Sequence, residues 1–190
     1  MTAASFIVRR DAVHIVTDAL ASYSREGVHT GAMHKVHPMP AVSGAFVARG
    51  DLGLAAELRA AVDLSVGDLD AKAAAMPKEW TRLTQLHDER ARSMDAFLAG
   101  FSPQHREFVV YLVSGFDRPD MPSGQLHRLG GVVTPPLAKP IDFDDTREDV
   151  KRLARRIYTE QCTQTEPWQV GGFCQLTSVF RDRIVTRVLT

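Results

Sequence analysis

The chain has 190 residues, in which 23 lysines and arginines balance 23 aspartates and glutamates, and 44% of the residues are hydrophobic. This length and composition predict one globular domain, residues 1–190, and the charge balance gives no electrostatic basis for binding nucleic acid or an anionic membrane. No apolar run approaches the roughly 20 residues that span a bilayer.

The N-terminus has no basic segment followed by a long apolar core, so it is not expected to act as a secretory signal. The two cysteines, Cys162 and Cys174, suit a reducing compartment, where both are expected as plain thiols rather than as a disulfide. We therefore expect a cytoplasmic protein.

The first part of the chain has the pattern of β-structure. Two apolar, β-branched runs flank Arg10-Asp11 and predict a hairpin with a two-residue turn. A connection over 22–31 is followed by two shorter strands around the turn Pro38-Met39-Pro40. The predicted strands of this part are 5–9, 12–19, 32–36 and 42–47.

Helical spacing begins after Gly50-Asp51 and predicts a helix from Leu52 to Val62. A second helical region is predicted over 68–98, divided at Pro77 or with a helix beginning there. The remaining predicted elements are strands 108–114 and 125–129, a helix over 145–161, and a final hairpin of 172–178 and 184–189. Hairpins grouped around helices predict an α+β fold, namely a four-layer αββα sandwich of two mostly antiparallel sheets with helices outside.

Thr2 is the first candidate for chemistry. If Met1 is removed, Thr2 presents a hydroxyl and a free α-amine on one residue. The hydroxyl is a weak nucleophile that needs a base, and an α-amine with an ordinary pKa of about 7.7 to 8.0 can act as that base near neutral pH.

A nucleophile of this kind also needs a nearby cation and a backbone N–H that stabilises an oxyanion. A buried cation must itself be paired with an anion. Asp18 ends the apolar second strand, Lys35 lies in the predicted third strand, and Gly50 stands between a strand and a helix. These residues supply a carboxylate, a cation and a backbone donor.

The whole chain resembles the N-terminal-nucleophile hydrolases, and among them the β-type subunits of proteasomes and their bacterial and phage-encoded relatives. Thr2 matches the family's nucleophile, and the separation of 16 positions between Thr2 and Asp18 follows its pattern. Asp18 to Lys35 is 17 positions, one more than usual. The other matching stretches are IVTDALAS at 15–22, HKVH at 34–37, VARGDLGLAAEL at 47–58, and the closing hairpin VGGFCQLTSVFRDRIVTRVL.

The resemblance implies a role for each matched residue. Thr2 would act as nucleophile and, through its amine, as base, while Lys35 would tune the pKa of Thr2. Asp18 would pair with Lys35, and the N–H of Gly50, rather than that of Gly53, would form the oxyanion hole. Three further residues would line a substrate groove with a preference for an apolar side chain: Ser22, Met33 and Ala48.

The resemblance also implies an activity and partners. The expected reaction is cleavage of amide bonds in a peptide or protein substrate through an acyl-enzyme, without a metal or other cofactor. Relatives assemble into rings or helical stacks, so a homo-oligomer is expected.

The sequence departs from the family at two supporting positions. The family's Asp and Ser before the terminal glycine pair are replaced by Glu166-Pro167-Trp168-Gln169-Val170, and its mid-chain serine has no match within 130–134. An alternative is therefore a catalytically degenerate structural or assembly protein, for example of a phage particle. A third reading is a non-peptidase amidohydrolase on the same fold.

The seven histidines do not predict a metal site. His29, His34 and His37 are clustered, but His34 and His37 would face opposite sides of a strand, and no acidic or cysteine partner has the spacing of a ligand.

Overall fold

A computed structural model describes residues 3–22, 29–87, 92–137, 148–163 and 170–189. These residues form two five-stranded antiparallel sheets, a two-stranded ribbon and three α-helices, which confirms the predicted α+β class. The helices are α1 (Leu52–Leu64), α2 (Leu69–Leu86) and α4 (Val150–Cys162).

The first sheet contains both ends of the described chain. Its strand order is β10-β1-β2-β11-β12, so the N-terminal hairpin β1–β2 lies beside the C-terminal hairpin β11–β12. The register places Ala4 between Thr17 of β2 and Thr134 of β10. The strands are β1 (Ala4–Val8), β2 (Val13–Thr17), β10 (Val132–Thr134), β11 (Cys174–Val179) and β12 (Ile184–Leu189).

The second sheet has the strand order β5-β6-β7-β8-β9, so that each strand pairs with its neighbour along the chain. Its strands are β5 (Val36–Met39), β6 (Gly44–Arg49), β7 (Asp95–Ser102), β8 (Glu107–Ser114) and β9 (Leu126–Leu129). A separate ribbon pairs β3 (Leu20–Ser22) with β4 (His29–Ala32).

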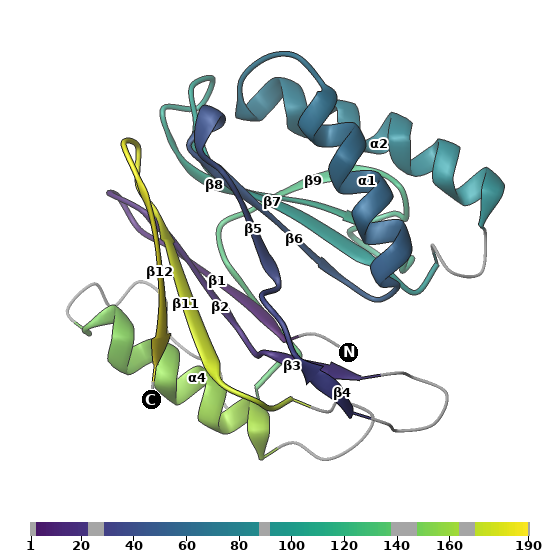
Figure 1. Ribbon diagram of the computed structural model, residues 1–190. Helices are drawn as coiled ribbons and strands as arrows, with labels where there is room; N and C mark the ends of the chain where they lie inside the picture. Colours follow the sequence, from purple (N-terminus) through teal and green to yellow (C-terminus); the bar gives the residue numbers. More distant parts are fainter. Residues whose placement is uncertain (1–2, 23–28, 88–91, 138–147, 164–169, 190) are drawn as a thin grey trace.

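The two large sheets face each other, and the helices lie on their outer faces (Figure 1). One apolar cluster fills the space between the sheets and includes Phe6, Ile15 and Phe97, with the rings of Phe6 and Phe97 centred 4.8 Å apart. A second cluster joins α1 and α2 to the second sheet, and a third joins α4 to the first sheet. Burial of these apolar faces stabilises the layers.

Aspartate side chains cap the N-termini of the three helices in the described part of the chain. Asp51, Asp68 and Asp149 each accept hydrogen bonds from backbone N–H groups in the first turn of α1, α2 and α4. At the other end of α1, the buried Lys72 of α2 donates hydrogen bonds to the carbonyls of residues 62, 63 and 65. The Lys72 cation therefore satisfies the C-terminal carbonyls of α1 and joins the two helices.

The predicted helical region 68–98 is wrong in its second half. Helix α2 continues through Pro77 and ends at Leu86, whereas Asp95–Ser102 is strand β7. This central strand is buried on both faces, so its sequence lacks the alternation that marks a half-exposed strand. A short apolar run of this kind does not distinguish a strand from a buried helix.

The segment around Lys35 also differs from the prediction. Residues 33–35 connect β4 to β5, so Lys35 precedes a strand instead of lying within one. The predicted turn at 38–40 is partly strand, because Pro38 and Met39 belong to β5. Since β5 is an edge strand, it tolerates a proline that has no N–H to donate.

His14 is expected to make the stability of the protein depend on pH. The ring is buried and its Nδ1 lies 2.8 Å from Ser178 Oγ, and burial, aided by Arg9 and opposed by Asp11, lowers the pKa of His14 from 6.5 to about 4. Between these values the unfolded chain binds a proton that the folded protein does not. The free energy of unfolding should therefore fall by about 3 kcal/mol as the pH is lowered through this window.

Urea unfolding followed from pH 7 to pH 4 tests this expectation. His14→Gln should flatten the dependence, whereas His105→Gln, at an exposed histidine, should leave it as in the wild type. Equal pH slopes for the wild type and His14→Gln would contradict the assignment to His14.

Candidate functional site

A buried ion pair lies beyond the end of β2. Asp18 directly follows this strand, and its Oδ1 accepts a hydrogen bond from Lys35 Nζ at 2.7 Å. The side chains are 0% and 4% exposed, respectively, so the pair is shielded from water. The structure thus brings together two of the predicted site residues, although they come from different segments.

Asp18 also holds two backbone segments. Its Oδ1 accepts a hydrogen bond from the N–H of Ala3 at 2.8 Å, and its Oδ2 lies 3.5 Å from the N of Gly171. Both oxygens of the carboxylate therefore have donors, as a buried charge requires. The nitrogen of Ala3 forms its peptide bond with the carbonyl carbon of Thr2.

The glycine pair opposite Asp18 is held by close backbone contacts. The carbonyl of Gly171 accepts hydrogen bonds from the N–H groups of Ala19 and Leu20 at 3.2 and 3.0 Å. The hydroxyl of Tyr158, on α4, donates to the carbonyl of Gly172 at 3.1 Å. Burial raises the pKa of Tyr158, so its hydroxyl stays protonated and remains a donor. Helix α4 thereby fixes the loop that faces Asp18.

Two opposing effects act on the charge of Lys35. Burial lowers the pKa of Lys35, and the negative charge and hydrogen bond of Asp18 counteract part of that effect. The net pKa lies below the ordinary value for lysine. A buried ammonium with one carboxylate partner is suited to stabilising a second negative charge that develops beside it.

Gly50 occupies a position that accepts no larger residue. It lies between β6 and the N-cap Asp51, with a φ of +105°. A Cβ at this position would lie 2.5 Å from the carbonyl oxygen of Ser93 and 2.9 Å from Cα of Met94. The backbone of Gly50 therefore rests directly against the segment that leads into β7.

The remaining predicted residues have different outcomes. Thr2 lies outside the described residues, as do residues 164–169, which hold most of the departures from the family pattern. Ser22 pairs with His29 in the β3–β4 ribbon, and its side chain lies outside the described part. The N–H of Met33 donates to the carbonyl of Ala19 at 2.8 Å. Ala48 packs against the apolar cluster on the helix side of the second sheet.

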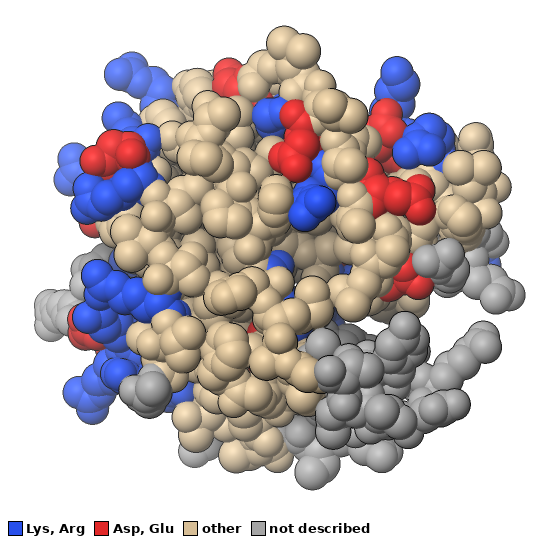
Figure 2. All heavy atoms as spheres, viewed as in Figure 1, with Lys and Arg blue, Asp and Glu red and all other residues tan. Residues whose placement is uncertain are grey.

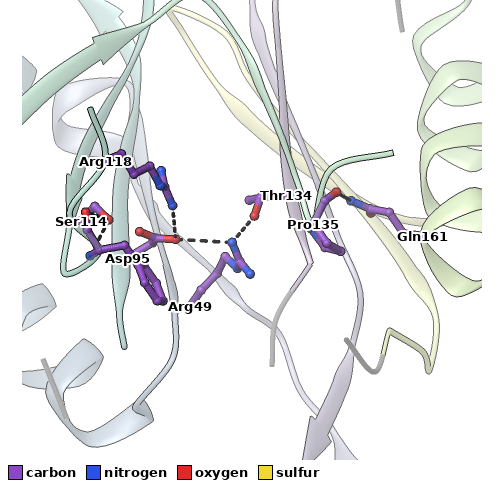
Figure 3. Close-up of polar contacts among 8 residues, drawn as sticks. Arg49, Asp95, Ser114, Arg118, Thr134, Pro135 and Gln161 are labelled. Atoms are coloured by element: carbon purple, nitrogen blue, oxygen red, sulfur yellow. Dashed lines mark hydrogen bonds and ion pairs between the residues drawn. The ribbon is translucent and has the colours of Figure 1, made fainter. Parts of the chain in front are cut away.

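Arg49 directly precedes Gly50 but is not among the predicted site residues. Arg49 is 6% exposed, lies 3.4 Å from Asp95 and donates a hydrogen bond to the hydroxyl of Thr134 on the facing sheet (Figure 3). Burial lowers the pKa of Arg49, and the carboxylates of Asp95 and Asp18 counteract this effect. Arg49 is a charged residue at the end of an apolar strand, which is the same sequence signal that identified Asp18.

The molecular surface is hollowed below α1, and Lys or Arg atoms are visible inside the hollow (Figure 2). Two shallow depressions found elsewhere lie at the hairpin turns, and neither contains a predicted site residue. The first depression is lined by Ala41, Val42, Ser43, Gly67, Asp68, Phe101 and Pro103. The second is lined by Arg10, Asp11, Phe108, Phe180, Arg181 and Asp182. Within the described residues, no three His, Cys, Asp or Glu side chains are grouped as metal ligands.

Comparison of the chain with protein-family models gives no match, and comparison with curated proteins gives none either. Among the described residues, no helix is both long enough and apolar enough to cross a bilayer. Both described cysteines are free thiols, with Cys162 exposed and Cys174 buried.

Proposed function

We propose that the protein is an N-terminal threonine hydrolase of the proteasome β-subunit type, which cleaves amide bonds through an acyl-enzyme on Thr2. The observation that carries this proposal is the buried contact of Asp18 with both Lys35 Nζ and the N–H of Ala3. Because Ala3 is bonded to Thr2, one carboxylate holds both the activating cation and the residue next to the nucleophile. The two antiparallel sheets with outer helices support the same proposal.

In the proposed reaction, the hydroxyl of Thr2 attacks the carbonyl carbon of the substrate, and the free α-amine of Thr2 accepts the hydroxyl proton. The Lys35 ammonium stabilises the developing negative charge, and the N–H of Gly50 donates to the oxyanion. The amine then returns the proton to the leaving amine, and a water molecule hydrolyses the ester. An oligomeric assembly and a protein or peptide substrate belong to this proposal.

The proposal predicts covalent labelling of Thr2 by a β-lactone, an electrophile that acylates an activated hydroxyl. Intact mass spectrometry should show a chain without Met1 that gains one equivalent of the lactone. Thr2→Ala should abolish the labelling, and Lys35→Met should slow it at least about a hundredfold, the scale of losing one group that stabilises an oxyanion.

Lys78→Met supplies the matched control, because it removes a lysine from α2 and leaves the Asp18 pair intact. It should label like the wild type. Quantitative retention of Met1, or a Met1-free chain that does not react, would contradict the proposal. The second of these results would favour the structural or assembly protein.

A further inference from the structure

The two sheets are joined by polar contacts near the proposed site. Arg49 and Thr134 form a hydrogen bond across the space between the sheets, Arg49 from β6 and Thr134 from β10 (Figure 3). Most of this space is filled by the apolar cluster around Phe6 and Phe97. A charged group in such surroundings keeps a defined position because its burial is tolerated only while its hydrogen bonds are made.

Each end of this contact is anchored in its own sheet. Asp95 is the register partner of Arg49 on β7, and its Oδ2 lies 3.4 Å from Arg49 and 3.7 Å from Arg118. On the other side, Gln161 of α4 donates to the carbonyl of Pro135 at 3.0 Å and lies 3.2 Å from the hydroxyl of Ser5. Helix α4 thus ties β10 to β1 next to Thr134.

Arg49 and Thr134 each lie next to a segment that the proposed reaction uses. Arg49 is bonded to Gly50, where a Cβ would meet residues 93 and 94. Thr134 is the register partner of Ala4 on β1, and Ala3 binds Asp18. A connected series of contacts therefore runs from the Asp18 carboxylate, through β1 and β10, to the peptide at Gly50.

We propose that Arg49 is a positioning residue that, through the hydroxyl of Thr134, sets the place of the Gly50 N–H relative to strand β1. This inference rests on the proposed function, in which β1 begins at the nucleophile and Gly50 stabilises the oxyanion. The two groups lie on different sheets, so their alignment depends on how the sheets are held together at this end. Displacements of about 1 Å are sufficient to slow such a reaction.

Thr134→Val tests the inference because valine keeps the shape of threonine and removes only the hydroxyl that binds Arg49. The first readout is the rate of β-lactone labelling, divided into the maximal inactivation rate and the concentration for half-saturation. The maximal rate should fall about tenfold, the effect of losing one hydrogen bond to a charged group, and the half-saturating concentration should stay within about twofold.

Thr186→Val is the matched control. Thr186 lies on β12, the border strand opposite β10 in the same sheet, where its hydroxyl lies 3.0 Å from that of Thr177. It should label like the wild type. A change confined to half-saturation, or an equal loss of rate in both variants, would overturn the positioning role.

Amide hydrogen exchange gives a second readout that does not depend on activity. The N–H groups of residues 49–51 should exchange about tenfold faster in Thr134→Val than in the wild type, and Thr186→Val should leave them unchanged. Unchanged exchange in Thr134→Val would overturn the inference whatever the labelling shows. A wild-type protein that loses Met1 and does not react with the lactone would overturn the proposed function instead.

Discussion

Asp18→Asn is expected to lower the free energy of unfolding by about 3–5 kcal/mol, the usual cost of removing one partner of a buried ion pair. Asparagine has nearly the size of aspartate, so little packing is lost. What remains is the Lys35 ammonium, 4% exposed and without its carboxylate. Urea unfolding at pH 7, followed by circular dichroism, measures the loss.

The pH dependence of Asp18→Asn identifies the cause. Without the carboxylate, the pKa of Lys35 should fall further below its ordinary value in the folded protein. The unfolded chain then binds a proton over a range in which the folded protein does not, so the deficit in stability should shrink as the pH rises toward about 10. A deficit that stays constant with pH would contradict a buried unpaired lysine as its source.

Two further variants serve as controls for Asp18→Asn. Asp182→Asn breaks an exposed ion pair with Arg183, so its effect should be within about 0.5 kcal/mol. The double variant Asp18→Asn with Lys35→Met removes both charges and should recover part of the loss. Equal losses of unfolding free energy for Asp18→Asn and Asp182→Asn would show that burial does not determine how much the Asp18–Lys35 ion pair contributes to stability.

Gly50→Ala is expected to cost about 2–4 kcal/mol of stability. The φ of +105° strains any residue with a side chain, and the new Cβ would meet the carbonyl oxygen of Ser93 at 2.5 Å. Relief requires movement of backbone, either at Gly50 or at Ser93 and Met94. Thermal and urea unfolding of the purified variant measure the cost.

Gly130→Ala is the matched control for this change. Gly130 has no positive φ, and a Cβ there would meet no atom within 4 Å. Its effect on stability should be within about 0.5 kcal/mol, and either sign is acceptable. If Gly50→Ala were as stable as Gly130→Ala, that result would contradict the close contact between Gly50 and Ser93.

Local patterns in the sequence predicted the elements that are rich in β-branched residues or bounded by turn and capping residues. Strands β1 and β2 are β-branched runs on either side of Arg10-Asp11, and helix α1 begins at the capping residue Asp51. Strand β7 is equally buried but contains no β-branched residue, so its apolar run also fits a buried helix, and the information that makes it a strand lies in its neighbours β6 and β8.

The candidate site likewise contains residues that sequence patterns predicted and contacts that only the fold reveals. Asp18 was found because it ends an apolar run, and Lys35 because it lies in a predicted strand and a buried cation needs an anionic partner. The donors of Ala3 and Gly171, and the support from Tyr158, are contacts between segments far apart in the chain, and no local pattern predicts them. Arg49 follows the same rule, because it closely follows the predicted strand 42–47. Asp95 does not, because the strand that it begins was predicted as helix.

Pro38 has a consequence for contacts between molecules. Strand β5 forms one border of the second sheet, and the nitrogen of Pro38 carries no hydrogen. An exposed strand normally offers a row of donors and acceptors to which a strand of another molecule can add. At β5 that row is interrupted, so a second copy of the chain cannot continue the sheet there by an unbroken ladder. Assembly through this side of the molecule would therefore depend more on side-chain contacts than on a continuous sheet.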